Sequence, residues 1–219
     1  MSQSSSTTDA AGLGLANMWI SFVAFAAACL LGVYQVVERS GLVPQLESPE
    51  LYFASVSTHG VLMGFVLTTF LVMGFGYYTA TTSLKQALWS KPLAWFGFWV
   101  AVTGVLLAAF ALLTGQASVL FTFYPPLMAH PLFYIGAVLL VVGSWIWCLQ
   151  MIMMMVTWKR ENPGETVPLA MYGTTANAIM WLWTSVGVAS EILFQPVSYT
   201  HLRAHETERT ISYAVFCLK

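Results

Sequence analysis

Charged side chains are scarce in this chain. Asp, Glu, Lys and Arg make up 8% of its 219 residues, whereas 58% of the residues are hydrophobic. A soluble globular domain carries about 25% charged residues, so this composition excludes one. It indicates instead an integral membrane protein, with membrane lipid as its immediate surroundings.

A basic cluster and a cysteine framework are also absent. The formal net charge is −1, and no run of Lys and Arg alternates with aromatic residues, so nucleic acid is excluded as an expected partner. The three cysteines, Cys29, Cys148 and Cys217, lie far apart, and the first two lie within apolar runs where cysteine behaves as a small hydrophobe. No disulfide framework is predicted.

The first seventeen residues, MSQSSSTTDAAGLGLAN, contain no Lys or Arg. A secretory signal peptide needs a positively charged start, so this segment is not predicted to be one. Its small and polar residues predict a disordered leader over residues 1–17. Met18 is then expected to begin a membrane span that the mature protein retains.

Five segments are long and apolar enough to cross a bilayer, which takes about 20 residues of helix. They predict an all-α fold, a polytopic membrane helix bundle. The expected helices are 18–37, 51–80, 92–114, 132–158 and 168–195.

The distribution of positive charge predicts the orientation of these spans. Four of the five Lys and Arg residues that precede Gln195 lie in the second and fourth connections, on the side of the N-terminus: Lys85, Lys91, Lys159 and Arg160. The positive-inside rule therefore places the N-terminus in the cytoplasm. The second span then begins on the outer side near Leu51, and at 1.5 Å per residue His59 lies roughly 12 Å below that surface.

The segment 196–219 differs in character from the rest. His201 and His205 have the i, i+4 spacing that suits a metal on a helix. However, Val197 to Thr207 and Ile211 to Leu218 resemble, in one frame and in the right order, two parts of a translated sequencing adapter. We therefore expect a non-native, adapter-derived tail, to be excluded from fold reasoning, and a chain that is cut off inside or just after its fifth span.

His59 is an ionisable residue inside the apolar stretch SVSTHGVLMGFVLTTFLVMGF. Such residues are costly in a membrane and face a partner or a ligand. One interpretation is structural, a neutral imidazole hydrogen-bonded to a backbone carbonyl. The other is functional: an imidazole nitrogen is a suitable axial ligand for haem iron, and Gly60 and Gly64 would let a flat group approach the helix closely.

The third connection, GQASVLFTFYPPLMAHPLFYIGA, carries no Asp, Glu, Lys or Arg and lies on the same outer side as His59. Tyr124, Pro125 and Pro126 predict a rigid segment at the membrane interface, because each proline fixes its own φ and restricts the residue before it. Taken alone, this is an ordinary loop with a tyrosine anchor.

Together, STHGVLMGF in the second span and FTFYPPLMAHPLFYIGA before the fourth are similar to the N-terminal part of subunit I of the haem-copper terminal oxidases. The closest likeness is to the group that includes the ba3-type cytochrome c oxidases. The resemblance covers roughly residues 18–195, including ENPGETVPL and SVGVASEILF. It implies a subunit of twelve or more spans in the cell membrane of a prokaryote.

The resemblance also implies cofactors and partners. His59 matches one axial ligand of the low-spin haem, of type b, and Tyr124 would lie close to the haem propionates. The high-spin haem and the copper are expected only in a full-length protein, because their ligands belong to later helices. Electrons would come from cytochrome c or a similar donor, and other oxidase subunits would be partners.

Two further polar residues carry weaker signals. His130, beside Pro131, is interpreted as a hydrogen-bonded histidine at the membrane interface. Glu191 lies within the fifth span and fits either a protonated structural residue or part of a polar route.

Two alternatives remain open from the residues. One is the large subunit of a nitric oxide reductase, where a non-haem iron replaces copper. The other is a cofactor-free membrane transporter, with His59 as a packed polar residue.

Overall fold

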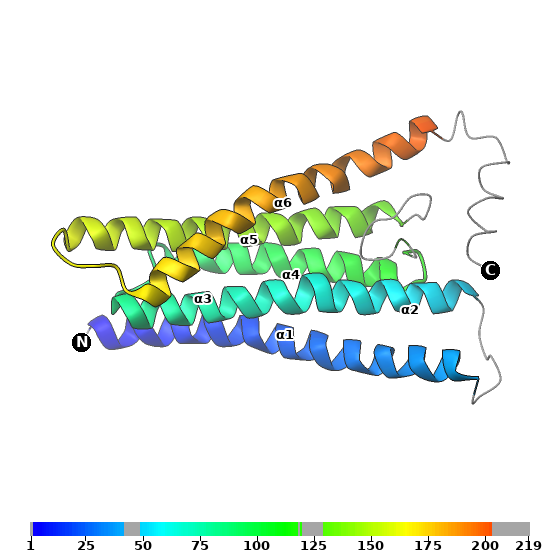
Figure 1. Cartoon of the computed structure of the whole chain (residues 1–219), viewed down its shortest axis with the longest axis horizontal. Coiled ribbons are helices and arrows are strands. Elements are labelled where there is room, and N and C mark those ends of the chain that lie inside the picture. The colour runs from blue at the N-terminus through cyan, green and yellow to red at the C-terminus, as the bar shows by residue number, and fades with distance from the viewer. Residues whose placement is uncertain (1, 42–48, 118, 120–128, 203–219) are drawn as a thin grey trace.

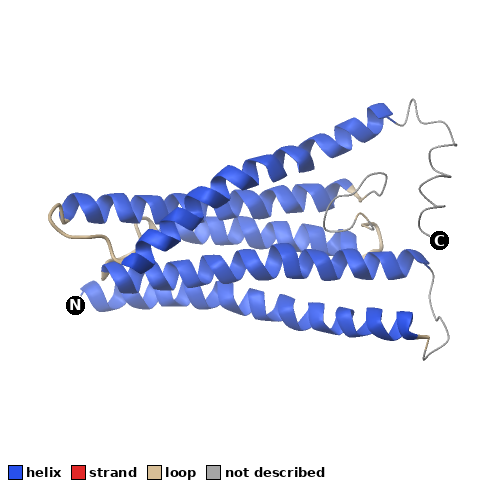
Figure 2. Cartoon of the chain, viewed as in Figure 1, coloured by secondary structure: helices blue, strands red, loops and turns tan. Residues whose placement is uncertain are grey.

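The structure, a computed structural model, describes residues 2–41, 49–117, 119 and 129–202. Long helices run along a common axis and form a bundle, as Figure 1 and Figure 2 show. Over the described ranges the only β-type pairing is an isolated bridge between Ala117 and Ala129. Five helices are long and apolar enough to cross a membrane. The predicted all-α membrane helix bundle is confirmed.

The helices correspond to the five predicted spans, with the second span divided into three consecutive elements. Their bounds are α1 Ser2–Ser40, α2 Pro49–Val61, η1 Leu62–Leu67, α3 Thr68–Leu84, α4 Lys91–Leu113, α5 Pro131–Glu161 and α6 Leu169–Leu202.

The prediction of a disordered leader over residues 1–17 is wrong. α1 begins at Ser2, and both Leu13 and Asn17 are fully buried. A Cβ on Gly14 would lie 3.2 Å from the carbonyl oxygen of Gly74, so α1 and α3 approach closely there. Small residues permit such close packing, and the packing secures a helix that the local Ser and Thr content disfavours.

The tail expected from residue 196 is only partly described. α6 passes this boundary and ends at Leu202, while residues 203–219, with His205, lie outside the described part. The helical conformation of residues 196–202 is compatible with a native segment and with an adapter-derived one. The origin of the tail therefore stays a prediction.

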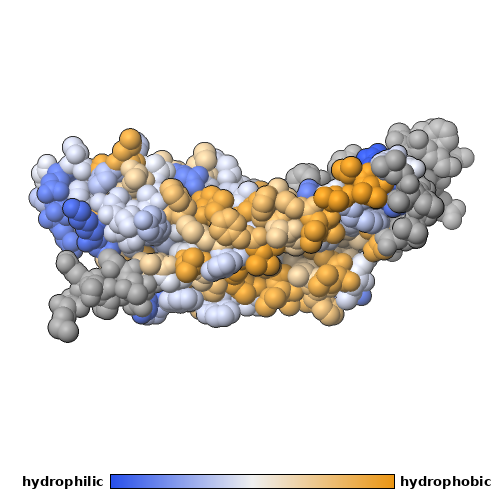
Figure 3. Space-filling view, turned by 90° about the horizontal axis from the view of Figure 1, so that it is seen from below, coloured by the Kyte–Doolittle hydropathy of each residue, from blue (hydrophilic) through white to orange (hydrophobic). Residues whose placement is uncertain are grey.

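The two ends of the bundle differ in charge. The N-terminus, the α3–α4 connection and the α5–α6 connection lie at one end (Figure 1), where the described cations are Lys85, Lys91, Lys159 and Arg160. Figure 3 shows hydrophilic residues gathered at that end and hydrophobic ones along the middle of the molecule. Exposed apolar side chains such as Leu113 (85%) and Trp183 (87%) suit contact with lipid hydrocarbon.

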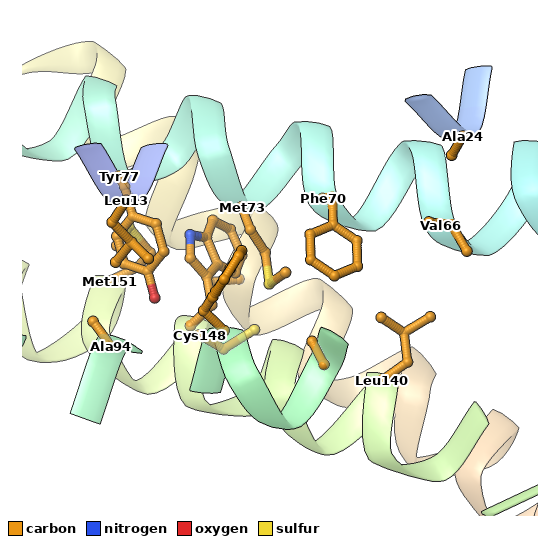
Figure 4. Packing of buried hydrophobic residues seen from close by; sticks show 14 of the residues in the cluster. Leu13, Ala24, Val66, Phe70, Met73, Tyr77, Ala94, Leu140, Cys148 and Met151 are labelled. Atoms are coloured by element: carbon orange, nitrogen blue, oxygen red, sulfur yellow. The ribbon is translucent and has the colours of Figure 1, made fainter. Parts of the chain in front are cut away.

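The core lies where α3, α4 and α5 meet. Phe70, Met73 and Tyr77 of α3 are buried and project toward Cys148 and Met151 of α5 (Figure 4). No charged side chain enters this cluster, whose residues are apolar or aromatic. Packing of this kind positions α3, and with it the whole second span.

Glycines bring α4 and α5 into backbone contact. A Cβ on Gly104 would lie 2.5 Å from the carbonyl oxygen of Gly136, and a Cβ on Gly136 would lie 2.5 Å from that of Gly104. Gly97 and Gly143 form a second close approach one heptad along each helix. Because lipid is as apolar as the side chains, such close van der Waals packing drives helix association in membranes.

Paired hydrogen bonds fasten α6 to α5. The Trp145 indole donates to the Ser185 hydroxyl at 2.7 Å, and the Trp181 indole donates to the Ser144 hydroxyl at 2.8 Å. Each helix thus supplies one tryptophan donor and one serine acceptor. Both half-buried indole N–H groups of this pair thus have a partner, as an apolar environment requires.

The second span contains a π-helical segment, η1, only three residues after His59. In this geometry the N–H groups bond to carbonyls five residues earlier instead of four. The Ser21 hydroxyl of α1 donates to the carbonyl of Leu67, the last residue of η1, at 3.1 Å. A side chain of α1 thus supports the irregular turn.

We expect Gly136→Ala to lower the free energy of unfolding by about 1–3 kcal/mol, because the added methyl group overpacks the α4–α5 contact. Thermal unfolding in detergent measures the loss. Gly173→Ala is the matched control, since a Cβ on this helical glycine meets nothing within 4 Å. Equal effects of the two substitutions would contradict the packing role.

Ser21→Ala is expected to cost about 0.5–1.5 kcal/mol, the net value of the lost hydrogen bond to Leu67. The control is Ser190→Ala, whose hydroxyl bonds only within its own helix, to the Val186 carbonyl at 2.8 Å. Chemical unfolding of both variants in one detergent compares them. The support of η1 by Ser21 is rejected if Ser190→Ala is as costly.

Candidate functional site

His59 lies in α2, half-buried against α1. Its Nδ1 atom is 2.8 Å from the carbonyl oxygen of Ala28. Since a carbonyl oxygen only accepts hydrogen bonds, Nδ1 must carry the proton. In the neutral ring Nε2 is then unprotonated and has a lone pair available for a ligand.

The wall beside the imidazole is a stripe of α1 formed by Ala28, Gly32 and Gln35, hereafter the α1 stripe. These positions share one helix face because they are spaced i, i+4 and i+7. A Cβ on Gly32 would lie 3.3 Å from Cε1 and 3.6 Å from Nδ1 of His59. The Gln35 amide donates to the Ser55 carbonyl at 3.1 Å, one turn before His59.

The hydrogen bond to Ala28 is compatible with both interpretations of His59. It is the backbone partner that the structural interpretation expects. It is also the outer contact that a metal-bound histidine makes, because a carbonyl acceptor on one ring nitrogen fixes the tautomer and orients the other nitrogen. Geometry alone thus leaves the ring ready to bind a metal ion without requiring one.

A cavity that is lined in part by the residues following His59 is too small for a large cofactor. It has a volume of about 40 Å³, begins two residues after His59 and has an entirely apolar lining that includes Val61, Leu62 and Phe65. Sites for drug-sized ligands or cofactors occupy about 300–1,000 Å³. A haem bound to His59 would therefore lie outside this cavity, on the surface of the second span where Gly64 is exposed and Gly60 half-buried.

The donor set fits one axial position of a haem. His59 offers an unprotonated nitrogen in apolar surroundings, which suits haem iron. Among the described residues no group of three or more His, Cys, Asp or Glu side chains gathers to hold a metal ion. Within the described residues, His59 would thus be a single ligand and not a member of a local metal cluster.

Of the other predicted residues, the structure describes His130 and Glu191 but not Tyr124. Tyr124 lies outside the described residues, so its expected position near the haem propionates stays a prediction. His130 is exposed at the start of α5, where its Nδ1 accepts a hydrogen bond from the Leu132 N–H at 3.3 Å. This agrees with an interfacial, hydrogen-bonded histidine. Glu191 is exposed on α6.

Sequence reasoning missed the contribution of α1. The Ala28 carbonyl is a backbone group and carries no signature in the sequence. Gly32 and Gln35 lie in an ordinary apolar span, and only their i, i+3 spacing on one face could have suggested a joint contact. The π-helical segment also has no proline or polar signal within LMGFVL.

Residues 12–208 match the family model described as cytochrome c and quinol oxidase polypeptide I. Cytochrome c oxidase subunit 1 of Thermus thermophilus is 31% identical over 185 residues, which cover 80% of this chain and 32% of that protein. A chain from the cryo-EM structure of a heme-copper terminal oxidase dimer matches with a TM-score of 0.79 and 39% identity. That match covers 85% of this chain and 32% of the other.

These findings confirm the resemblance to subunit I of the haem-copper terminal oxidases. The chain spans about a third of the length of these two relatives. The matched range includes His59, four of the five described spans in full and all but the first two residues of the span Ala10–Ser40. The chain belongs to the cytochrome c and quinol oxidase polypeptide I family.

Proposed function

We propose that the chain is the N-terminal part of subunit I of a respiratory cytochrome c oxidase and that His59 is an axial ligand of its low-spin haem, of type b. The carrying observation is the 2.8 Å hydrogen bond from Nδ1 to the Ala28 carbonyl. It keeps the proton on Nδ1 and leaves Nε2 to bind iron. Family membership supplies the reason to expect iron at this nitrogen.

The bound haem would supply one-electron transfer. His59 would hold the iron through Nε2, together with a second histidine from a later helix. The Ala28 carbonyl keeps Nδ1 protonated and increases the basicity of the ring.

Oxygen reduction itself would take place beyond this chain. The second axial ligand, the high-spin haem and the copper with its ligands would come from later helices of a subunit with twelve or more spans. Electrons would enter from cytochrome c or a similar donor on the outer face, in a complex with other oxidase subunits. In this proposal the chain contributes one haem ligand and the helices that orient it.

The proposed orientation places the N-terminus in the cytoplasm of a prokaryotic cell, with the bundle in the plasma membrane. It is supported by the four cations at the end of the bundle that holds the N-terminus. His59 would then lie in the outer half of the membrane, on the side where the donor arrives.

The alternatives receive less support than the oxidase. Both relatives named above are oxidases, which favours a haem-copper enzyme over a nitric oxide reductase. The hydrogen bond of His59 to Ala28 is compatible with a cofactor-free transporter as well, but the family match over residues 12–208 favours the oxidase. We therefore do not propose either one.

His59→Ala in the complete gene product, in its own membranes, should remove the low-spin haem absorbance and leave the high-spin haem in place. Reduced-minus-oxidised difference spectra and haem extraction measure this loss. His130→Ala is the control and should keep both haems, because His130 only caps α5. Unchanged low-spin absorbance in His59→Ala would refute the ligand role.

The proposed adapter origin of residues 197–218 is tested on DNA. Long-read sequencing of the source DNA across the codon for Gln195 should show a frame that continues into further membrane spans with intramembrane histidines. A native frame that reads through the present C-terminal residues as printed would overturn the adapter interpretation.

A further inference from the structure

We propose that Gly32 is a positioning residue for His59: its missing side chain leaves the space that fixes the plane of the imidazole, and through the ring the electronic state of the bound haem. This inference rests on the proposed ligand role of His59. Gly32 would touch neither the iron nor the porphyrin. It would act only through the histidine.

The space beside Gly32 is occupied by the ring itself. A Cβ at this position would come within 3.3 Å of Cε1, which is closer than an ordinary van der Waals contact, and within 3.6 Å of Nδ1. Both atoms belong to His59, and neither is backbone. The glycine therefore receives a ring edge, not a neighbouring helix.

The imidazole faces the α1 stripe with two adjacent ring atoms, Nδ1 and Cε1. The Ala28 carbonyl fixes Nδ1 at 2.8 Å, and the space left by the missing Cβ of Gly32, one turn later, receives the edge of the ring that carries Cε1. A ring that must keep its hydrogen bond and clear Gly32 has little freedom to rotate. Its plane, and hence the direction of the Nε2 lone pair, is set by these two contacts.

The helices that carry these groups cannot slide apart without losing hydrogen bonds. On the outer side of His59, the Gln35 amide binds the Ser55 carbonyl at 3.1 Å. On the inner side, the Ser21 hydroxyl binds the Leu67 carbonyl at 3.1 Å. A methyl group at position 32 would therefore displace mainly the ring, by a few tenths of an ångström, instead of the helices.

Other glycines of α1 have different surroundings and provide matched controls. Gly12 has nothing within 4 Å of its ideal Cβ. Gly14 meets the backbone of α3, and on the facing helix a Cβ on Gly74 would lie 2.8 Å from the Gly14 carbonyl oxygen. Gly74 thus serves helix packing, whereas the neighbour of Gly32 is the imidazole.

The test compares Gly32→Ala, Gly12→Ala and Gly74→Ala in the complete gene product with its haems bound. Three quantities are measured: the EPR g values of the oxidised low-spin haem, the midpoint potential of that haem, and the thermal stability of the protein. The g values report the orientation of the axial rings. Haem content is measured in each variant.

We expect Gly32→Ala to keep its low-spin haem with displaced g values and a shifted potential. Gly12→Ala should match the wild type in every measurement, and Gly74→Ala should lose stability while its g values stay unchanged. Wild-type g values and potential in Gly32→Ala would overturn the positioning role and leave Gly32 as a packing residue.

If Gly32→Ala does not accumulate, Gln35→Leu tests the positioning of His59 instead. This substitution adds no group against the ring and removes the hydrogen bond to the Ser55 carbonyl that holds α2 in register. Displaced g values in Gln35→Leu support positioning by the α1 stripe, and unchanged values overturn it. A wild-type protein that lacks low-spin haem, or a His59→Ala variant that keeps it, would instead refute the proposed ligand role. The two failures are thus distinguishable.

Discussion

The absence of water from the bilayer core is the constraint on which this fold depends. Each backbone N–H and carbonyl must find its partner within the protein, so the chain crosses the membrane as continuous helix. At the ends of the spans, side chains complete the pairing. The Gln150 amide accepts from the Ser90 N–H at 3.2 Å and donates to the Ser90 carbonyl at 2.5 Å, where α4 begins. The Gln86 amide donates to the Met154 carbonyl at 3.0 Å.

The same constraint explains which ring nitrogen of His59 carries the proton. An imidazole in apolar surroundings needs a partner for its N–H, and the carbonyl of Ala28 provides one although that carbonyl belongs to a helix. This partner decides which nitrogen is left without a proton. The requirement for hydrogen bonding in lipid thus leaves Nε2 as the unprotonated nitrogen of the neutral ring.

The sequence predicted those parts of the fold that depend on length and composition. Each apolar run of sufficient length became a helix, and the resemblance around His59 identified the family. The parts that it missed depend on contacts between distant residues. Leu13 and Asn17 are helical because α3 buries them, and the partner of His59 is a backbone atom thirty-one residues away. Local residue types do not encode such contacts. Tyr124 falls outside the described residues, so its place near the haem propionates stays a prediction.

The π-helical segment of the second span has a consequence for the phase of that helix. Each residue of an α-helix turns the chain by about 100°, and a π-helical turn holds one residue more than an α-helical turn. If the residues Leu62–Leu67 were wound as regular α-helix, α2 would therefore be rotated by about 100° relative to α3. His59 could then face α1 only if Phe70 and Tyr77 left the core. The π-helical winding of this segment thus keeps the face that carries His59 and the packing face of a single span in register.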